Sequence, residues 1–168
     1  MADGLPDIIA ENLAVLFCGI NPGMLAAATG HHFAGRGNRF WRVIHLAGFT
    51  PEEVLPQDDR TILRYGCGLT TVVERPTARA DQVAAREFSA AASKFEKKIA
   101  RYTPRFVAFL GKAAYAALSG RADFDWGLQP SSMGSSAVWV LPNPSGRNRA
   151  FNLDELVSAY RRLYRAAH

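Results

Sequence analysis

The sequence has only two cysteines, Cys18 and Cys67, in 168 residues. Two thiols are too few for a four-cysteine zinc or iron–sulfur site, and stable disulfides are unusual in reducing compartments. Both cysteines are therefore expected to be reduced structural residues. The histidines also lack the spacing of a metal site, because the only close pair, His31 and His32, is adjacent in the chain and adjacent residues rarely ligate one ion. We expect no bound metal.

Long apolar runs are absent as well. None approaches the roughly 18 residues that a membrane-spanning helix needs, and the first residues lack the pattern of a signal peptide. A cytoplasmic, nucleoid-associated protein is the resulting expectation. With 168 residues, 48% of them hydrophobic, the chain is long enough to bury a core, and we expect a single domain over residues 1–168.

Lysine is scarce among the basic residues. Of the 20 lysines and arginines only four are lysines, at positions 94, 97, 98 and 112, and the formal net charge is +5. Arginine forms paired hydrogen bonds to phosphate and stacks on bases, so this composition suits a nucleic-acid-binding protein. A genome rich in G and C would also enrich arginine, and charge alone does not separate the two explanations.

Several common catalytic and cofactor-binding motifs are missing. The glycine-containing segment 19–23 is of a kind that can cradle a phosphate, but it lacks the lysine of a P-loop and the spacing of a dinucleotide fingerprint. Residues 35–39 do not form G-x-G-x-x-G either. Ser145 follows a proline, so the nucleophile elbow of α/β-hydrolases is absent. No cofactor is expected.

What the sequence does contain is an alternation of buried-strand and helix patterns. Apolar runs predict strands over 13–19, 69–73, 106–110 and 137–141. Apolar spacings of three and four predict helices from about 38, over 58–64, 83–102 and 112–119, and after the capping box of Asn152 and Glu155. This alternation predicts an α/β, three-layer sandwich with a short, mainly parallel central sheet flanked by helices. Trp41 and Trp126 are expected in its core.

Two segments of similar chemistry follow predicted strands: Gly-Ile-Asn-Pro-Gly at 19–23 and Asn-Pro-Ser-Gly at 143–146. Ligands of open parallel sheets bind at the carboxyl ends of the strands, so the two segments are expected to form two walls of one site. Proline stiffens such a loop, and glycine lets its backbone approach a ligand closely.

Asn21 presents an amide, which can orient a water molecule or bind a base edge but cannot act as a general base. A reaction here must then depend on stabilising a leaving group or a cation, as in cleavage of an N-glycosidic bond. A uracil anion can leave if backbone N–H groups hold its oxygens while water adds to the sugar cation. Phe33, in the following loop, is the aromatic residue available to stack on the base.

Five segments spread in order over nearly the whole chain carry a resemblance to a known family. They are Gly-Ile-Asn-Pro-Gly at 19–23, Gly-His-His-Phe at 30–33, Gly-Asn-Arg-Phe-Trp at 37–41, Glu-Arg-Pro-Thr at 74–77 and Asn-Pro-Ser-Gly at 143–146. Together they resemble the mismatch-specific uracil/thymine DNA glycosylases, which include the bacterial Mug enzymes and the catalytic core of eukaryotic thymine-DNA glycosylases, within the uracil-DNA glycosylase superfamily.

The resemblance implies a monomeric, monofunctional enzyme that acts on a uracil flipped out of double-stranded DNA with G:U-type mismatches. Asn21 resembles the asparagine that positions the attacking water, Phe33 matches the aromatic that stacks on the base, and the backbone around Ile20 and Phe33 would read the uracil edges. No lysine adjoins Asn21, so a Schiff-base lyase step is not expected. The loop expected to enter the duplex contributes Asn143, Ser145, Gly146, Arg147, Asn148 and Arg149.

The chain departs from the bacterial pattern at Arg147, where those relatives commonly carry leucine. An arginine can stack on bases and bind phosphate, which leaves the demand for an opposite guanine open. Ala26 is small where some bacterial members carry serine, so acceptance of thymine or bulkier lesions is open too.

Other polar residues have both structural and functional interpretations. Asp81, and less so Glu74, are candidates for a general base if the 74–82 loop reaches the water; otherwise they are solvated loop acids, with Glu74 expected to pair with Arg75 or Arg79. Asn38 and Arg39 are expected to organise or cap a helix start, or else to touch phosphate. Arg36, Arg79 and Arg149 are expected to contact the DNA backbone.

Two other functions stay open from sequence. One is a non-catalytic DNA-damage binding module on the same fold. The presence of both Asn21 and Phe33 argues against this alternative. The other is an enzyme acting on free nucleosides or nucleotides, which the basic composition and the arginines of the 147–149 loop disfavour.

Overall fold

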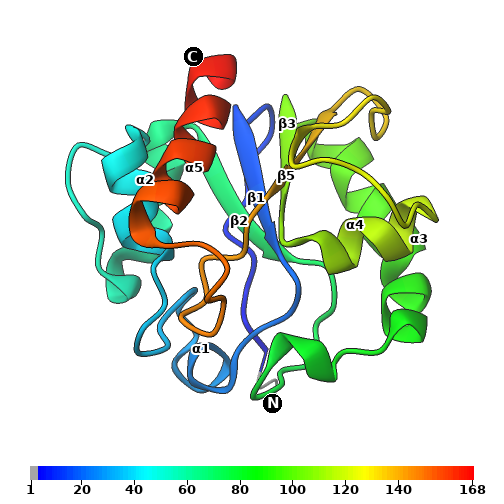
Figure 1. The fold of residues 1–168 in the computed structure, drawn as a ribbon, viewed down its shortest axis with the longest axis horizontal. Coiled ribbons are helices and arrows are strands. Elements are labelled where there is room, and N and C mark those ends of the chain that lie inside the picture. Colours follow the sequence, from blue (N-terminus) through cyan, green and yellow to red (C-terminus); the bar gives the residue numbers. More distant parts are fainter. Residues whose placement is uncertain (1–3) are drawn as a thin grey trace.

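The structure, a computed structural model, describes residues 4–168 and contains a five-stranded sheet in the order β2-β1-β3-β5-β4. The strands are β1 (Val15–Gly19), β2 (Cys67–Thr71), β3 (Phe106–Leu110), β4 (Gly127–Leu128) and β5 (Ala137–Leu141). The first three and β5 are parallel, and only the two-residue edge strand β4 is antiparallel to its neighbour β5. The predicted mainly parallel sheet is confirmed (Figure 1).

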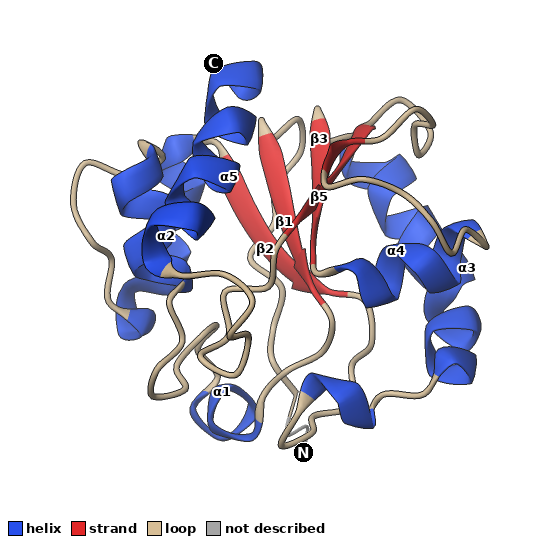
Figure 2. Cartoon of the chain, viewed as in Figure 1, coloured by secondary structure: helices blue, strands red, loops and turns tan. Residues whose placement is uncertain are grey.

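Helices cover both faces of this sheet (Figure 2). One face carries α2 (Phe40–Ala47), α5 (Leu153–Ala167) and the 3₁₀ helix η1 (Pro56–Tyr65), and the other carries α3 (Ala85–Tyr102) and α4 (Lys112–Ser119). The predicted three-layer α/β sandwich is therefore confirmed. None of the helices in the described part of the chain is long and apolar enough to cross a membrane.

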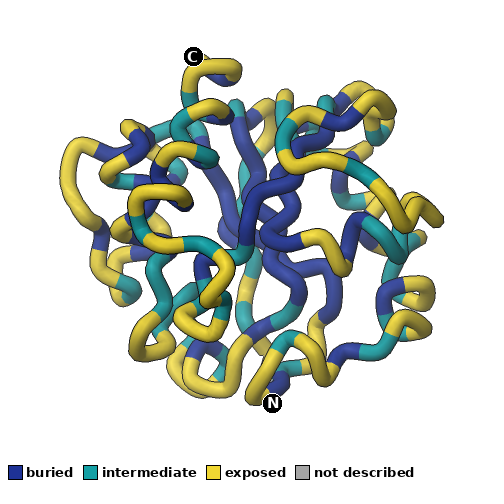
Figure 3. Tube along the Cα trace, in the orientation of Figure 1, coloured by how far each residue is buried: buried dark blue, intermediate teal, exposed yellow. Residues whose placement is uncertain are grey.

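The alternation of side chains along the strands explains the two cores. In β1, Val15 and Phe17 join the cluster under α2 and α5, whereas Leu16 and Cys18 join the cluster under α3 and α4. Successive strand residues point to opposite faces, so a strand covered on both sides is apolar throughout. All five residues of β1 are buried, as are those of β2 (Figure 3). This rigid sheet fixes where the loops that follow its strands begin.

Both cysteines lie in this sheet and are free and buried. Burial raises the pKa of the Cys67 thiol to about 12 and raises the pKa of Cys18 as well. Neither thiol is then a thiolate near neutral pH, and the expected structural role is consistent with these positions.

Three short elements lie where no regular structure was predicted: α1 (Met24–Thr29), the 3₁₀ turn η2 (Ala80–Gln82) and β4. Each has six residues or fewer, which is too short for an apolar period to be visible. The predicted helix at 58–64 is a longer 3₁₀ helix with non-helical φ/ψ at Asp58. The second strand lies two residues earlier than the expected 69–73, at Cys67–Thr71, because Cys67 and Gly68 pair with Val15 and Leu16 of β1.

Of the two tryptophans predicted to lie in the core, only one does. Trp41 is buried, with 4% of its surface exposed, as expected. Trp126 is 41% exposed, and its prediction as a core residue is wrong. It lies just before the edge strand β4 and packs edge-to-face on Phe151, with the Lys112 ammonium 4.7 Å from its ring centroid. At the edge of the sheet these two neighbours leave the rest of the indole exposed.

Candidate active site

A cleft of about 560 Å³ opens at the carboxyl ends of β1, β3 and β5. Its walls come from both Asn-Pro segments, from the loop that follows α1 and from residues 77–80. The loop after β5 lies beside the α1 region in Figure 1. As the sequence predicted, two loops far apart in the chain border one site.

The amide of Asn21 is held in one orientation by the segment that follows β2. Its Nδ2 donates to the Arg75 carbonyl at 2.7 Å and to Thr77 Oγ1 at 2.8 Å. A carbonyl oxygen only accepts, so the nitrogen must occupy this side. Asn21 Oδ1 accepts no hydrogen bond from residues 4–168 and is not fully buried. Because Asn21 lines the cleft, this oxygen is the acceptor available to a ligand or water there.

Thr77 completes this support and was not singled out from the sequence. Its hydroxyl donates to the Arg79 carbonyl at 2.6 Å and is thereby left to accept from Asn21. The backbone of Thr77 donates to Pro22 O at 3.1 Å, which joins this segment to the Asn21 loop directly. The Glu-Arg-Pro-Thr motif marked the segment, but its contact with Asn21 spans 56 residues and has no local signal.

The guanidinium of Arg75 anchors the same segment to α3. It donates to both carboxylate oxygens of Glu87, at 2.7 and 3.0 Å, and to the Gln82 carbonyl at 3.1 Å. The bond to Arg75 and the backbone bond to Ala84 lower the pKa of Glu87 to about 2. The carbonyl that holds Asn21 therefore belongs to a braced loop.

Phe33 lies where one face of its ring can meet a planar ligand. Its other face stacks on Phe40, with ring centroids 4.1 Å apart and the planes 20° from parallel. Phe33 lines the cleft and has a positive φ of 56°, a conformation that non-glycine residues seldom adopt. Its backbone N–H donates to no acceptor within residues 4–168.

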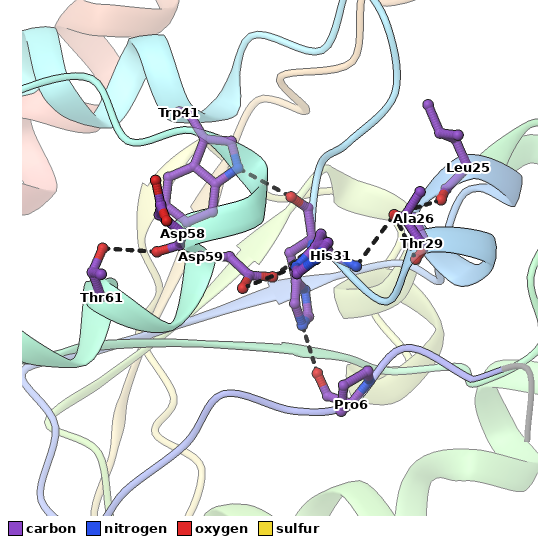
Figure 4. Close-up of polar contacts among 10 residues, drawn as sticks. Pro6, Leu25, Ala26, Thr29, His31, Trp41, Asp58, Asp59 and Thr61 are labelled. Atoms are coloured by element: carbon purple, nitrogen blue, oxygen red, sulfur yellow. Dashed lines mark hydrogen bonds and ion pairs between the residues drawn. The ribbon is translucent and has the colours of Figure 1, made fainter.

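His32, the residue before Phe33, forms hydrogen bonds through each of its polar groups except Nδ1. Its Nε2 donates to the Pro6 carbonyl at 2.7 Å, its backbone N–H donates to Asp59, and its carbonyl accepts from Trp41 Nε1 at 3.0 Å (Figure 4). Burial lowers the pKa of the ring, against the bond to Pro6, which raises it. The imidazole that lines the cleft is thus neutral at physiological pH.

The loop after β5 is organised by its own side chains. Asn143 Oδ1 accepts from the Ser145 N–H at 2.9 Å, and Asn148 Nδ2 donates to the Asn143 carbonyl at 2.9 Å. Gly146 lies against residue 37, since a Cβ there would be 2.8 Å from the Gly37 oxygen. Glycine is required for this approach.

Arg39 ties the loop after β5 to the start of α2. Its guanidinium donates to the carbonyls of Pro144, Ser145, Asn148 and Phe151, at 3.3, 2.8, 2.9 and 2.8 Å. Arg39 does occupy the N-cap position of α2, where its carbonyl accepts from the Val43 N–H at 2.8 Å. Its side chain makes no capping bond and organises the distant loop instead, and these four bonds occupy the guanidinium that would otherwise reach phosphate. The amide of Asn38 does serve the helix start, since Oδ1 accepts from the Phe40 N–H at 2.9 Å.

The sequence profile of the Uracil DNA glycosylase superfamily matches residues 6–164. This chain belongs to that superfamily. Its fold is similar to the solution NMR structure of a Methanosarcina acetivorans protein described as a candidate uracil DNA glycosylase, with a TM-score of 0.61 and 23% identity over 96% of this chain and 97% of that one.

Three arginines, but no carboxylate, line the cleft of this Uracil DNA glycosylase superfamily member within the described residues. Arg36, Arg79 and Arg147 reach the cleft, whereas Arg149 is exposed outside it. Arg79 is paired with Asp81 at 3.0 Å, and Arg147 lies exposed at the tip of the loop after β5. The positive cleft suits an anionic leaving group and the DNA backbone.

The two acids of the 74–82 loop lie outside the cleft. Glu74 pairs with Lys94 at 2.6 Å, so the expectation that it pairs with Arg75 or Arg79 is wrong. A residue 20 positions away on α3 reaches it better than its neighbours, whose side chains point to Glu87 and Asp81. The side chain of Asp81 is 74% exposed, and only its pairing with Arg79 brings it near the site.

No group of three or more His, Cys, Asp or Glu side chains is placed to hold a metal ion within residues 4–168. The cleft of this superfamily member is lined by amides, hydroxyls, backbone groups, the Phe33 ring, the His32 imidazole, arginines and apolar side chains. It brings together Ile20, Asn21, Phe33, Asn143, Ser145, Gly146 and Arg147 of the predicted residues, and leaves Asp81, Asn148 and Arg149 outside the lining.

Proposed function

We propose that this protein is a monofunctional, mismatch-specific uracil-DNA glycosylase. It hydrolyses the N-glycosidic bond of a uracil flipped out of double-stranded DNA and leaves an abasic site. The observation that carries this proposal is the amide of Asn21, whose nitrogen is committed to Arg75 and Thr77 and whose oxygen is free in the cleft. Membership of the Uracil DNA glycosylase superfamily supports the same activity.

In this reaction the C1′–N1 bond breaks and its electron pair leaves with the uracil. A water molecule donates a hydrogen bond to Asn21 Oδ1, its oxygen bonds to C1′, and its second proton is released to solvent. An amide cannot take that proton, but the sugar cation is electrophilic enough to react with neutral water. The enzyme therefore acts mainly by stabilising the departing anion.

The groups around the base suit that task. The Phe33 N–H is an unused donor in a residue that lines the cleft, and the three arginines make the potential of the cleft positive. The Phe33 ring offers one face to a base while Phe40 supports the other. A stacked, desolvated base strengthens every hydrogen bond to its oxygens. No lysine lines the cleft among the described residues, which supports hydrolysis without a lyase step.

The loop over 143–149 supports a duplex substrate. Asn143, Asn148 and Arg39 hold its backbone, and Arg147 stands exposed at its tip. A rigid loop with an arginine tip can fill the gap left by a flipped nucleotide and stack on its neighbours. We assign the preference for a mismatched partner to this loop.

The test is excision from labelled duplexes that carry G:U, A:U or G:T, and from single-stranded uracil, by wild type and Asn21→Ala. We expect cleavage of G:U that exceeds cleavage of A:U and disappears with Asn21→Ala while duplex binding persists. Equal cleavage of G:U and A:U would remove the mismatch preference and keep the glycosylase. Binding without cleavage of any substrate by the wild type would leave a DNA-damage binding module.

A further inference from the structure

Asp59, on η1, is a buried carboxylate that the proposed reaction does not use. Only 2% of the residue is exposed, and it does not line the cleft. Its neighbour Asp58 is exposed. Burying a carboxylate is costly unless hydrogen bonds compensate for the lost water, so the partners of Asp59 indicate what this carboxylate does.

Both carboxylate oxygens of Asp59 face the segment that carries Phe33 (Figure 4). Oδ2 accepts from the backbone N–H of His32 at 2.9 Å, and Oδ1 lies 3.4 Å from Nδ1 of His31. No other hydrogen bond to this carboxylate is formed within residues 4–168. Asp59 therefore holds residues 31 and 32, which lead into Phe33.

Two successive peptide planes are fixed as a result. Asp59 holds the plane between residues 31 and 32 through the His32 N–H, and Trp41 Nε1 holds the next plane through the His32 carbonyl at 3.0 Å. The second plane leads directly into Phe33, whose φ is 56°. A non-glycine residue keeps such a backbone conformation only when its surroundings over-determine it.

We propose that Asp59 is a positioning residue for base capture: it holds the 31–33 segment so that the Phe33 ring and N–H face the flipped base. This inference rests on the proposed function for its effect on catalysis. A carboxylate suits the role, because a hydrogen bond to an ionised acceptor is stronger than one to a neutral acceptor. Loss of Asp59 should weaken capture of the base but not binding of paired DNA, which depends on Arg36, Arg79 and the 143–149 loop.

The experiment compares Asp59→Ala, Asp59→Asn and the matched control Asp58→Asn. Single-turnover excision from a G:U duplex is measured beside the Kd for the same duplex with G:C in place of G:U. We expect Asp59→Ala to slow excision about tenfold or more, since a buried N–H loses its acceptor, with the Kd unchanged. Asp59→Asn keeps an acceptor for His32 and should retain most of the rate, and Asp58→Asn should match the wild type.

A core variant separates positioning from general loss of stability. Leu163→Ala truncates a buried residue of α5, in the half of that helix away from the cleft. This variant should have a lower Tm. Its excision rate, measured at a temperature where all variants are folded, should equal that of the wild type. Wild-type excision by Asp59→Ala, or an equal slowing by Asp59→Ala and Leu163→Ala, would overturn the inference.

Amide hydrogen exchange gives a readout that needs no activity. The His32 N–H should exchange slowly in the wild type and in Asp58→Asn, and at least tenfold faster in Asp59→Ala. Unchanged exchange in Asp59→Ala would refute the positioning role whatever the activity. If the wild type excises nothing while exchange responds as expected, the proposed function fails and the structural role of Asp59 stands.

Discussion

The two Asn-Pro loops have similar sequences and lie on the same cleft, yet their asparagines are used differently. The amide of Asn21 is held from outside its loop, by Arg75 and Thr77, and its Oδ1 is left for a ligand. The amide of Asn143 is used inside its own loop, where Oδ1 accepts from the Ser145 N–H. Both asparagines line the cleft, but the first loop leaves the amide oxygen free for a ligand, whereas the second uses that oxygen to build its own backbone.

The difference shows that the residue type at the end of a strand does not by itself assign a chemical role. What decides the role is which of its polar atoms the surrounding chain satisfies. Asn21 has a braced partner segment beside it, through Glu87 and Arg75. Asn143 has Arg39 and Asn148 fixing the loop around it. We infer that the first loop performs chemistry and the second shapes the contact with DNA.

The largest effect is expected from Asn21→Asp. A carboxylate oxygen would replace Nδ2 and face the Arg75 carbonyl, which Nδ2 now approaches to 2.7 Å, so repulsion would turn the side chain away. Excision should fall by about two orders of magnitude or more at pH 8. Only the protonated carboxyl can donate to the Arg75 carbonyl, so activity relative to wild type should recover as the pH is lowered. Wild-type activity of Asn21→Asp at pH 8 would contradict this orientation.

Arg39→Ala should come next, because it removes the scaffold of the second loop. Four carbonyls lose their bond from the guanidinium, and only those of Pro144 and Ser145 keep a backbone donor. Tm should therefore fall, and the Kd for a G:U duplex should rise roughly tenfold or more. Arg42→Ala, which removes an exposed arginine from α2, is the charge-matched control. If Arg39→Ala and Arg42→Ala raise the Kd equally, Arg39 contributes to binding only through its charge.

Thr77→Val tests the support of Asn21 at a smaller scale. The hydroxyl that accepts from Nδ2 disappears while the size of the side chain is kept. Excision should slow about tenfold, with duplex binding unchanged. Thr77→Ser keeps the hydroxyl and should restore most of the rate. A Thr77→Ser variant as slow as Thr77→Val would point to packing of the methyl group instead.

The smallest effect is expected from Asp81→Asn. Its carboxylate is exposed and paired with Arg79, and exposed ion pairs contribute little. Single-turnover excision should stay within about twofold of wild type. A large loss would revive Asp81 as a general base that moves into the cleft when DNA binds.

Much of the fold could be predicted because its signals are local. The apolar runs at 106–110 and 137–141 and the capping box of Asn152 and Glu155 match the structure. The short elements α1 and β4 have no such period, and Trp126 had no pattern to mark it as an edge residue.

The site was predictable where a motif carries the residue and not where a distant contact does. Asn21 and Phe33 follow from the resemblance and line the cleft. The supporting residues Arg39, Asp59 and Thr77 act through partners 27 to 112 residues away. Such pairs depend on how the loops pack, which no local spacing encodes.

The most direct test of the account is to measure Asn21→Ala and Asn143→Ala side by side on one G:U duplex, with single-turnover excision and Kd for each. Asn21→Ala should lose excision by about two orders of magnitude or more and keep the wild-type Kd. Asn143→Ala should weaken binding and, at saturating enzyme, keep excision within about tenfold of wild type. If both variants lose excision equally at saturation with unchanged Kd, the two loops share one chemical role and the account is contradicted.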